Sequence, residues 1–204
     1  MGDRAEATLA LAGSAMLGAL AVALDYALKY TGLKDLMSAP WAMAFPHLYF
    51  LKFDIDGVPI FCAMSFFGLA ASGLASTVLG LAIFVRAPHL IGLVGGAMKG
   101  LAEFSTVAGA YLGLRLPGRR RWAWTLLGPL SRAGVMSLAN LVVTPLVFQW
   151  PFELALALLP FIALFNLIQG AITTYLGLAV ALAVLRRASH VLPAQAPILR
   201  WSGG

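Results

Sequence analysis

Two stripes of polar side chains interrupt the apolar C-terminal half of the sequence, and each repeats at i, i+3 and i+7. Their members are Ser137, Asn140 and Thr144 in one run and Asn166, Gln169 and Thr173 in the next. In a helix this spacing places all three side chains of a stripe on one face. Amides and hydroxyls act by donating and accepting hydrogen bonds. The stripes therefore either bind one helix to another or line a pocket for a polar ligand.

Lys99 and Glu103 form an i,i+4 pair of opposite charge inside another apolar run. Ionisable groups inside a membrane are costly, and they commonly serve a function there. The pair either neutralises itself against neighbouring helices or turns one member towards a polar ligand. A membrane-embedded enzyme that uses the two groups as acid and base is a third interpretation.

Several catalytic signatures are missing from the sequence. It contains no GxxxxGK[ST] phosphate loop, no HExxH, no GxSxG and no Cys/His cluster with metal-ligand spacing. His47, His89 and His190 fall in expected loops or in the tail, and Cys62, the one cysteine, has no partner for an internal disulfide. We therefore expect no catalytic residue, no metal and no cofactor, and any energy from ATP would have to come from elsewhere.

The composition assigns the chain to a membrane. Hydrophobic residues make up 61% of the 204 positions and charged residues 11%, whereas soluble domains are about 45–50% apolar. Since a transmembrane helix needs about 20 apolar residues, we expect an all-α bundle of six transmembrane helices in one domain, residues 1–188. A short cytoplasmic tail without a core role, residues 189–204, follows it. The expected spans are residues 7–30, 58–69, 74–85, 90–114, 129–148 and 152–185.

Residues 31–57, between the first two expected helices, break the apolar pattern but keep several aromatic side chains. Loops of this length usually act as lids or binding loops. Alternating apolar residues over 47–54 favour a short strand. Asp54 or Asp56 is expected to cap the next helix, with Pro59 in its first turn.

Basic residues orient the expected bundle. The strongest cluster, at 115–121, is expected in the cytoplasm, and Arg186 and Arg187 end the last span on the same side. Both termini are then cytoplasmic, with residues 31–57 outside and a tight cytoplasmic turn at 70–73. The net charge of +6 is accordingly a topology signal and does not indicate nucleic-acid binding.

The first expected span carries alanines at strict i+4 spacing. They are Ala15, Ala19, Ala23 and Ala27. Such small-residue ridges let another helix approach closely in lipid, and from spacing alone we interpret this ridge as packing inside the bundle. Asp25 and Lys29, also at i,i+4, are expected to pair near the end of the span.

Four features occur together in one known family. They are six short spans, the alanine ladder, an aromatic first loop ending in LKFDIDGVP (residues 51–59) and the segment PFIALFNLIQG (residues 160–170). In these features the chain resembles the S components of energy-coupling-factor (ECF) vitamin transporters, most closely the riboflavin-specific branch. The likeness extends from residue 7 to residue 187.

The resemblance implies a vitamin-binding subunit in the cell membrane that joins a transmembrane coupling protein and two cytoplasmic ATPases. In the riboflavin branch, an asparagine of the fifth helix and an Asn-x-x-Lys of the sixth contact the flavin ring. Asn140 and Asn166 match the asparagines, and Gln169 stands at the lysine position. The family also places its helix-1 alanines against the coupling protein, which would assign that contact to Ala15, Ala19 and Ala23 and reverses the interpretation from spacing alone.

We therefore expect an outward-open riboflavin pocket between the fourth, fifth and sixth spans, roofed by residues 31–57. The expected substrate-binding residues are Lys99, Glu103, Asn140, Thr144, Asn166, Gln169 and Thr173. Two alternatives stay open. One is an S component for another vitamin, such as thiamin, or for a modified-base precursor. The other is a structural membrane protein whose stripes only join helices.

Overall fold

The computed structural model describes residues 3–116, 121–193 and 195–202, and all regular secondary structure in these ranges is helical. The elements are α1 (Asp3–Tyr30), α2 (Leu33–Ala44), η1 (Pro46–Leu48), α3 (Gly57–Phe67), α4 (Leu69–Arg86), α5 (Leu90–Arg115), α6 (Arg121–Phe148), α7 (Phe152–Ala188), η2 (Ser189–Val191) and α8 (Pro197–Ser202). Five helices, α1, α4, α5, α6 and α7, are long and apolar enough to cross a membrane. The all-α, multi-pass class predicted from the sequence is confirmed at this level.

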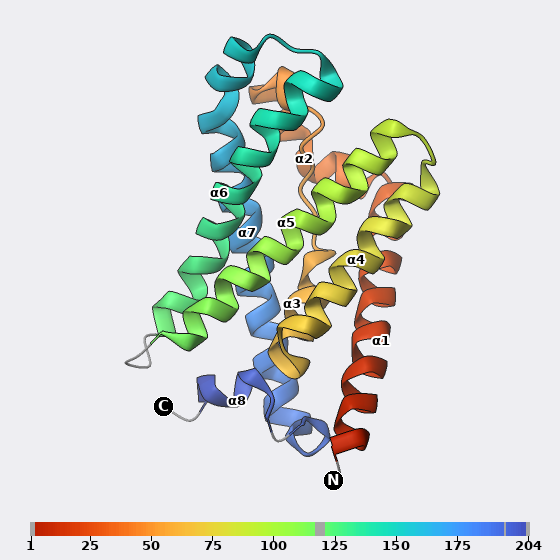
Figure 1. Ribbon diagram of the computed structural model, residues 1–204, viewed down its shortest axis with the longest axis vertical. Helices are drawn as coiled ribbons and strands as arrows, with labels where there is room; N and C mark the ends of the chain where they lie inside the picture. The colour runs from red at the N-terminus through yellow and green to blue at the C-terminus, as the bar shows by residue number, and fades with distance from the viewer. Residues whose placement is uncertain (1–2, 117–120, 194, 203–204) are drawn as a thin grey trace.

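The second expected span, residues 58–69, is a short helix in the structure, and an extended segment precedes it. The helix α3 has 11 residues, about half the length that a membrane crossing requires. Figure 1 shows the chain leaving α2 at one end of the bundle, running back without regular structure and entering α3 part-way along. Both termini lie at the opposite end from α2. The expected helix over 58–69 is therefore present as α3 at 57–67, but it is too short to count as a sixth membrane crossing.

The segment between α1 and α3 differs from the expected loop. Much of 31–57 is helical, in α2 and η1. The strand expected over 47–54 is wrong, because η1 and a turn occupy residues 47–50 and residues 51–54 have no regular structure. Trp41 and Leu48 are buried in a cluster with Phe165 of α7. The aromatic side chains of this segment pack against a helix, so no strand partner is needed to bury them.

Gly68 separates α3 from α4. Its φ of 94° lies in the region that glycine adopts without steric cost, and its N–H donates to the carbonyl of Met64 at the end of α3. The tight turn expected at 70–73 is therefore wrong, because those residues continue α4.

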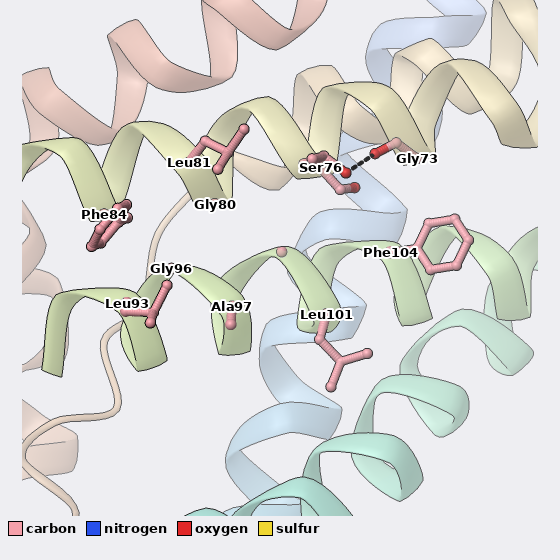
Figure 2. Close-up of a pocket in the computed structure, with 12 residues that line it drawn as sticks. Gly73, Ser76, Gly80, Leu81, Phe84, Leu93, Gly96, Ala97, Leu101 and Phe104 are labelled. Carbon is pink, nitrogen blue, oxygen red and sulfur yellow. Dashed lines mark hydrogen bonds between the residues drawn. The ribbon is translucent and has the colours of Figure 1, made fainter. Parts of the chain in front are cut away.

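Glycines allow α4 and α5 to cross closely (Figure 2). A Cβ added to Gly80 would lie 2.7 Å from the carbonyl oxygen of Gly96, and one added to Gly100 would lie 3.2 Å from that of Ser76. A groove of about 500 Å³ runs along this crossing.

The expected start of the next long helix at Pro129 is also wrong, since α6 begins at Arg121 and carries Pro129 in its interior.

The C-terminal segment has a core role that the sequence analysis did not predict. Ala196 and Ile198 are buried in the main hydrophobic cluster, together with Ile60 and Phe61 of α3 and Leu178 of α7. Apolar side chains of α8 thus close the bundle at the end that holds both termini (Figure 1).

Candidate ligand-binding site

A cavity of about 510 Å³ lies at the α2 end of the bundle, within the range of about 300–1,000 Å³ typical of small-molecule sites. Its walls come from α5, α6, α7 and residues 50–54, with the C-terminal ends of α1 and α4 at its margin. Aromatic side chains supply part of the lining, including Phe50, Phe148 and Phe165. The first two are stacked, with ring centroids 5.5 Å apart. This composition suits a flat apolar body with a few polar groups.

Three of the predicted site residues lie on the cavity wall: Lys99, Asn140 and Asn166. The other four are absent from the wall and are buried behind it. They are Glu103, Thr144, Gln169 and Thr173. Of the two predicted stripes, only one asparagine each thus reaches the cavity.

The cavity face of α6 follows an i, i+4, i+8 spacing through Arg132, Met136 and Asn140. The Nδ2 of Asn140 donates to the carbonyl of Met136 at 2.8 Å. On α7, the Nδ2 of Asn166 donates to the carbonyl of Ile162 at 2.9 Å, and its Oδ1 accepts from Arg132 Nε at 3.3 Å. Each asparagine thus donates one of its two amide N–H groups to a carbonyl of its own helix.

Gln169 holds the extended segment that precedes α3. Its Nε2 donates to the carbonyl of Asp54 at 2.8 Å and to Asp54 Oδ1 at 3.1 Å, and its Oε1 accepts from the Asp54 N–H at 3.4 Å. Extended backbone among membrane helices has no ladder partner, so a side chain must satisfy its polar groups. Both the oxygen and the nitrogen of the Gln169 amide are thus engaged in hydrogen bonds with Asp54 of the same chain.

Eight charged side chains form a network beside the cavity. Its members are Asp25, Lys34, Asp54, Asp56, Arg86, Lys99, Glu103 and Arg132. Lys99 Nζ lies 2.7 Å from Asp54, 2.6 Å from Asp56 and 2.9 Å from Glu103. Four acids thus meet four bases, as buried charges in a membrane protein require.

The network joins the α2 segment to the long helices. Lys34 of α2 lies 2.8 Å from Asp25 of α1 and 2.9 Å from Asp54. Burial disfavours the Lys34 ammonium, but the nearby carboxylates, Asp54 foremost, outweigh it and raise the pKa of Lys34 above its usual value. The expected Asp25–Lys29 pair is wrong, because Asp25 pairs with Lys34 and Arg86.

The aspartates before α3 do not cap it as expected. Asp56 occupies the N-cap position, but its side chain makes no capping hydrogen bond. The carboxylates of Asp54, Asp56 and Glu103 come within 4.8 Å of one another, a spacing that also suits a metal ion. The ammonium of Lys99 contacts all three, so the described geometry is that of carboxylates neutralised by a lysine.

Arg132 belongs to this site and was not predicted from the sequence. It lines the cavity and donates from Nη1 to Glu103 Oε1 at 2.7 Å. The signal that would have found it is its i,i+8 distance from Asn140, two helical turns along the same face.

The alanine ridge of α1 lies outside the site. Ala15, Ala19, Ala23 and Ala27 are exposed on the outer face of the bundle, while Gly18 faces Ala75 of α4.

No protein-family model matches the sequence, and no curated protein matches it. The function is therefore inferred from the residues and from the geometry around them.

Proposed function

We propose that this chain is the ligand-binding membrane subunit of a small-molecule uptake system, of the kind formed by the S components of ECF vitamin transporters. The observation that carries the proposal is the cavity at the α2 end of the helical bundle, with Lys99, Asn140 and Asn166 on its wall. Apolar walls would supply most of the affinity, and the polar groups would fix the orientation of the ligand. The resemblance of the 51–59 and 160–170 segments to that family supports the same reading.

Riboflavin is the ligand that we favour. Phe50, Phe148 and Phe165 line the cavity, and aromatic side chains pack well against a planar ring. Because Gln169 is engaged with Asp54, the proposed polar contacts come from Lys99, Asn140 and Asn166. An S component for thiamin or a modified-base precursor is the alternative within transport.

The proposed partners are a transmembrane coupling protein and two ATPase subunits in the cell membrane. The sequence has no phosphate loop of its own. The exposed Ala15, Ala19 and Ala23 of α1 offer a surface that a partner helix approaches closely. We propose that both termini face the cytoplasm, which agrees with their position at one end of the bundle (Figure 1).

Ligand binding tests the proposal directly. The full chain is purified in detergent, its bound small molecules are identified by mass spectrometry, and riboflavin and thiamin are titrated in separate samples. We expect saturable quenching of flavin fluorescence and a rise in unfolding temperature with riboflavin. A rise in unfolding temperature with thiamin alone would identify thiamin, and not riboflavin, as the ligand. A protein that co-purifies with no small molecule and responds to neither vitamin would contradict the proposal and favour a structural membrane protein.

A further inference from the structure

Arg132 carries a hydrogen-bond donor that the protein does not use. The residue is 3% exposed, and its Nε and Nη1 donate to Asn166 Oδ1 at 3.3 Å, to Glu103 Oε1 at 2.7 Å and to Thr106 Oγ1 at 3.4 Å. Its third nitrogen, Nη2, makes no hydrogen bond to the part of the chain that the structure describes, and Arg132 lines the cavity. An acceptor on a ligand in the cavity would bond to this nitrogen and complete the hydrogen bonding of the guanidinium.

The guanidinium is held in one orientation before a ligand binds. Glu103 on α5 fixes one edge and Asn166 on α7 fixes another, and a planar fork held on two sides loses little freedom on binding. Lys34 and Lys99 differ from Arg132 because each ammonium is shared among three carboxylates. Arg132 is therefore the better donor for a specific contact with a ligand.

The charges around the cavity favour an acceptor group with negative or partly negative charge. The lining contains six basic side chains and three acidic ones. Asp56 and Glu103, behind the wall, contribute two further carboxylates, which leaves one positive charge in excess. The excess charge is that of Lys29, exposed at the margin of the cavity, because the eight charges of the network balance and Lys52 pairs with Asp35. At this margin a cationic group would be repelled, and a carbonyl or carboxylate would be attracted.

The spacing along α6 sets the shape of the ligand. Arg132 and Asn140 lie eight residues apart, which corresponds to about 12 Å along a helix. Met136 lies between them on the same wall. A flat apolar body therefore fits along Met136, with an acceptor-bearing edge at Arg132.

We propose that Arg132 determines specificity by binding a carbonyl or carboxylate acceptor on the ligand. The cavity then takes planar ring compounds that carry such an edge and discriminates against similar rings that lack it. This inference rests on the proposed ligand-binding function and adds to it a residue outside the predicted set.

The test measures how tightly two tricyclic probes bind to the full-length protein in detergent and compares their affinities. Lumichrome carries two ring carbonyls, and phenazine carries none. In Arg132→Lys, which keeps a positive charge beside Glu103 but removes the planar fork, we expect lumichrome to bind about tenfold more weakly and phenazine within about twofold of the wild type. Arg115→Lys makes the same chemical change in the last turn of α5, outside the cavity lining, and should alter neither affinity.

A second variant guards against a folding defect. Arg132→Gln alone would remove one of the two cations that contact the buried Glu103 and leave it with Lys99, so it is combined with Glu103→Gln, and the same selective loss of lumichrome is expected. Unchanged lumichrome affinity in Arg132→Lys, or wild-type protein that binds phenazine as tightly as lumichrome, would overturn the inference and leave the proposed function standing. Failure of the wild type to bind lumichrome, phenazine, riboflavin and thiamin would overturn both.

Discussion

Lys99 holds three carboxylates together at the inner wall of the cavity. Its Nζ lies within 2.9 Å of an oxygen of Asp54, Asp56 and Glu103. The i,i+4 pair expected from the sequence is present, but it is one part of a larger network. Since the partners come from α5 and from the segment before α3, Lys99 fastens that segment to the bundle as well as lining the cavity.

Replacing this lysine should be costly. Lys99→Met leaves buried carboxylates without their shared cation, and removal of one partner from a buried ion pair typically costs about 3–5 kcal/mol. We expect a clearly lower unfolding temperature for Lys99→Met in detergent. Lys52→Met is the matched control, because Lys52 pairs with Asp35, whose side chain is 73% exposed, and exposed pairs contribute about 0–1 kcal/mol. Equal destabilisation by the two variants would contradict this role of Lys99.

Helical spacing predicted which polar residues share a face, but it could not predict what lies opposite that face. Asn140 and Asn166 reach the cavity, whereas Gln169 meets Asp54, which is 115 positions away in sequence. Nothing in the 160–170 segment indicates that extended backbone would pass beside it. Arg132 lies inside the expected span 129–148, but it precedes the stripe of Ser137, Asn140 and Thr144, so that stripe did not point to it.

The crossing of α4 and α5 depends on glycine at specific positions (Figure 2). Gly92, Gly96 and Gly100 recur every fourth residue on α5, a small-residue spacing that promotes close helix packing in membranes. The periodicity of apolar residues predicted the long helices because lipid requires continuous apolar runs. It did not predict α2 or the break at Gly68, because short helices and breaks leave no comparable pattern.

A methyl group at this crossing should weaken the bundle. In Gly80→Ala the new Cβ would lie 2.7 Å from the backbone oxygen of Gly96, so the helices must move apart at an overpacking cost of about 1–3 kcal/mol. Gly134→Ala is the control, since a Cβ at Gly134 meets no atom within 4 Å. We expect a lower unfolding temperature for Gly80→Ala and an unchanged or higher one for Gly134→Ala. A reversed order would show that the crossing is not close.

The short helix α8 should contribute to stability through Ile198. This side chain is fully buried in the main cluster, and truncation of a buried isoleucine to alanine usually costs about 2–5 kcal/mol. We expect Ile198→Ala to lower the unfolding temperature in detergent. Leu112→Ala on α5 is the comparison, because Leu112 is 62% exposed. An Ile198→Ala variant as stable as Leu112→Ala would return the C-terminal segment to the dispensable tail expected from the sequence.

The whole molecule separates two surfaces. The cavity lies at the α2 end, which Figure 1 shows opposite the two termini, and the alanines of α1 are exposed. The inner face of α1 packs against α4, with Gly18 beside Ala75. Ligand binding and partner binding would therefore use different residues, so mutations should separate the two activities.

Ala19→Trp tests that separation in the proposed transporter. Ala19 is exposed on α1, so the bulkier indole meets no residue of this chain's core, but it would hold a partner helix away from the alanine ridge. We expect uptake of riboflavin by cells that express the complete system to fall at least about tenfold, while the Kd of the purified subunit changes by less than about twofold. Ala179→Trp introduces the same side chain at an exposed position of α7 and should leave both measurements near those of the wild type. Full uptake with Ala19→Trp would remove the alanine ridge from the partner interface, and loss of ligand affinity in the same variant would show that α1 supports the cavity.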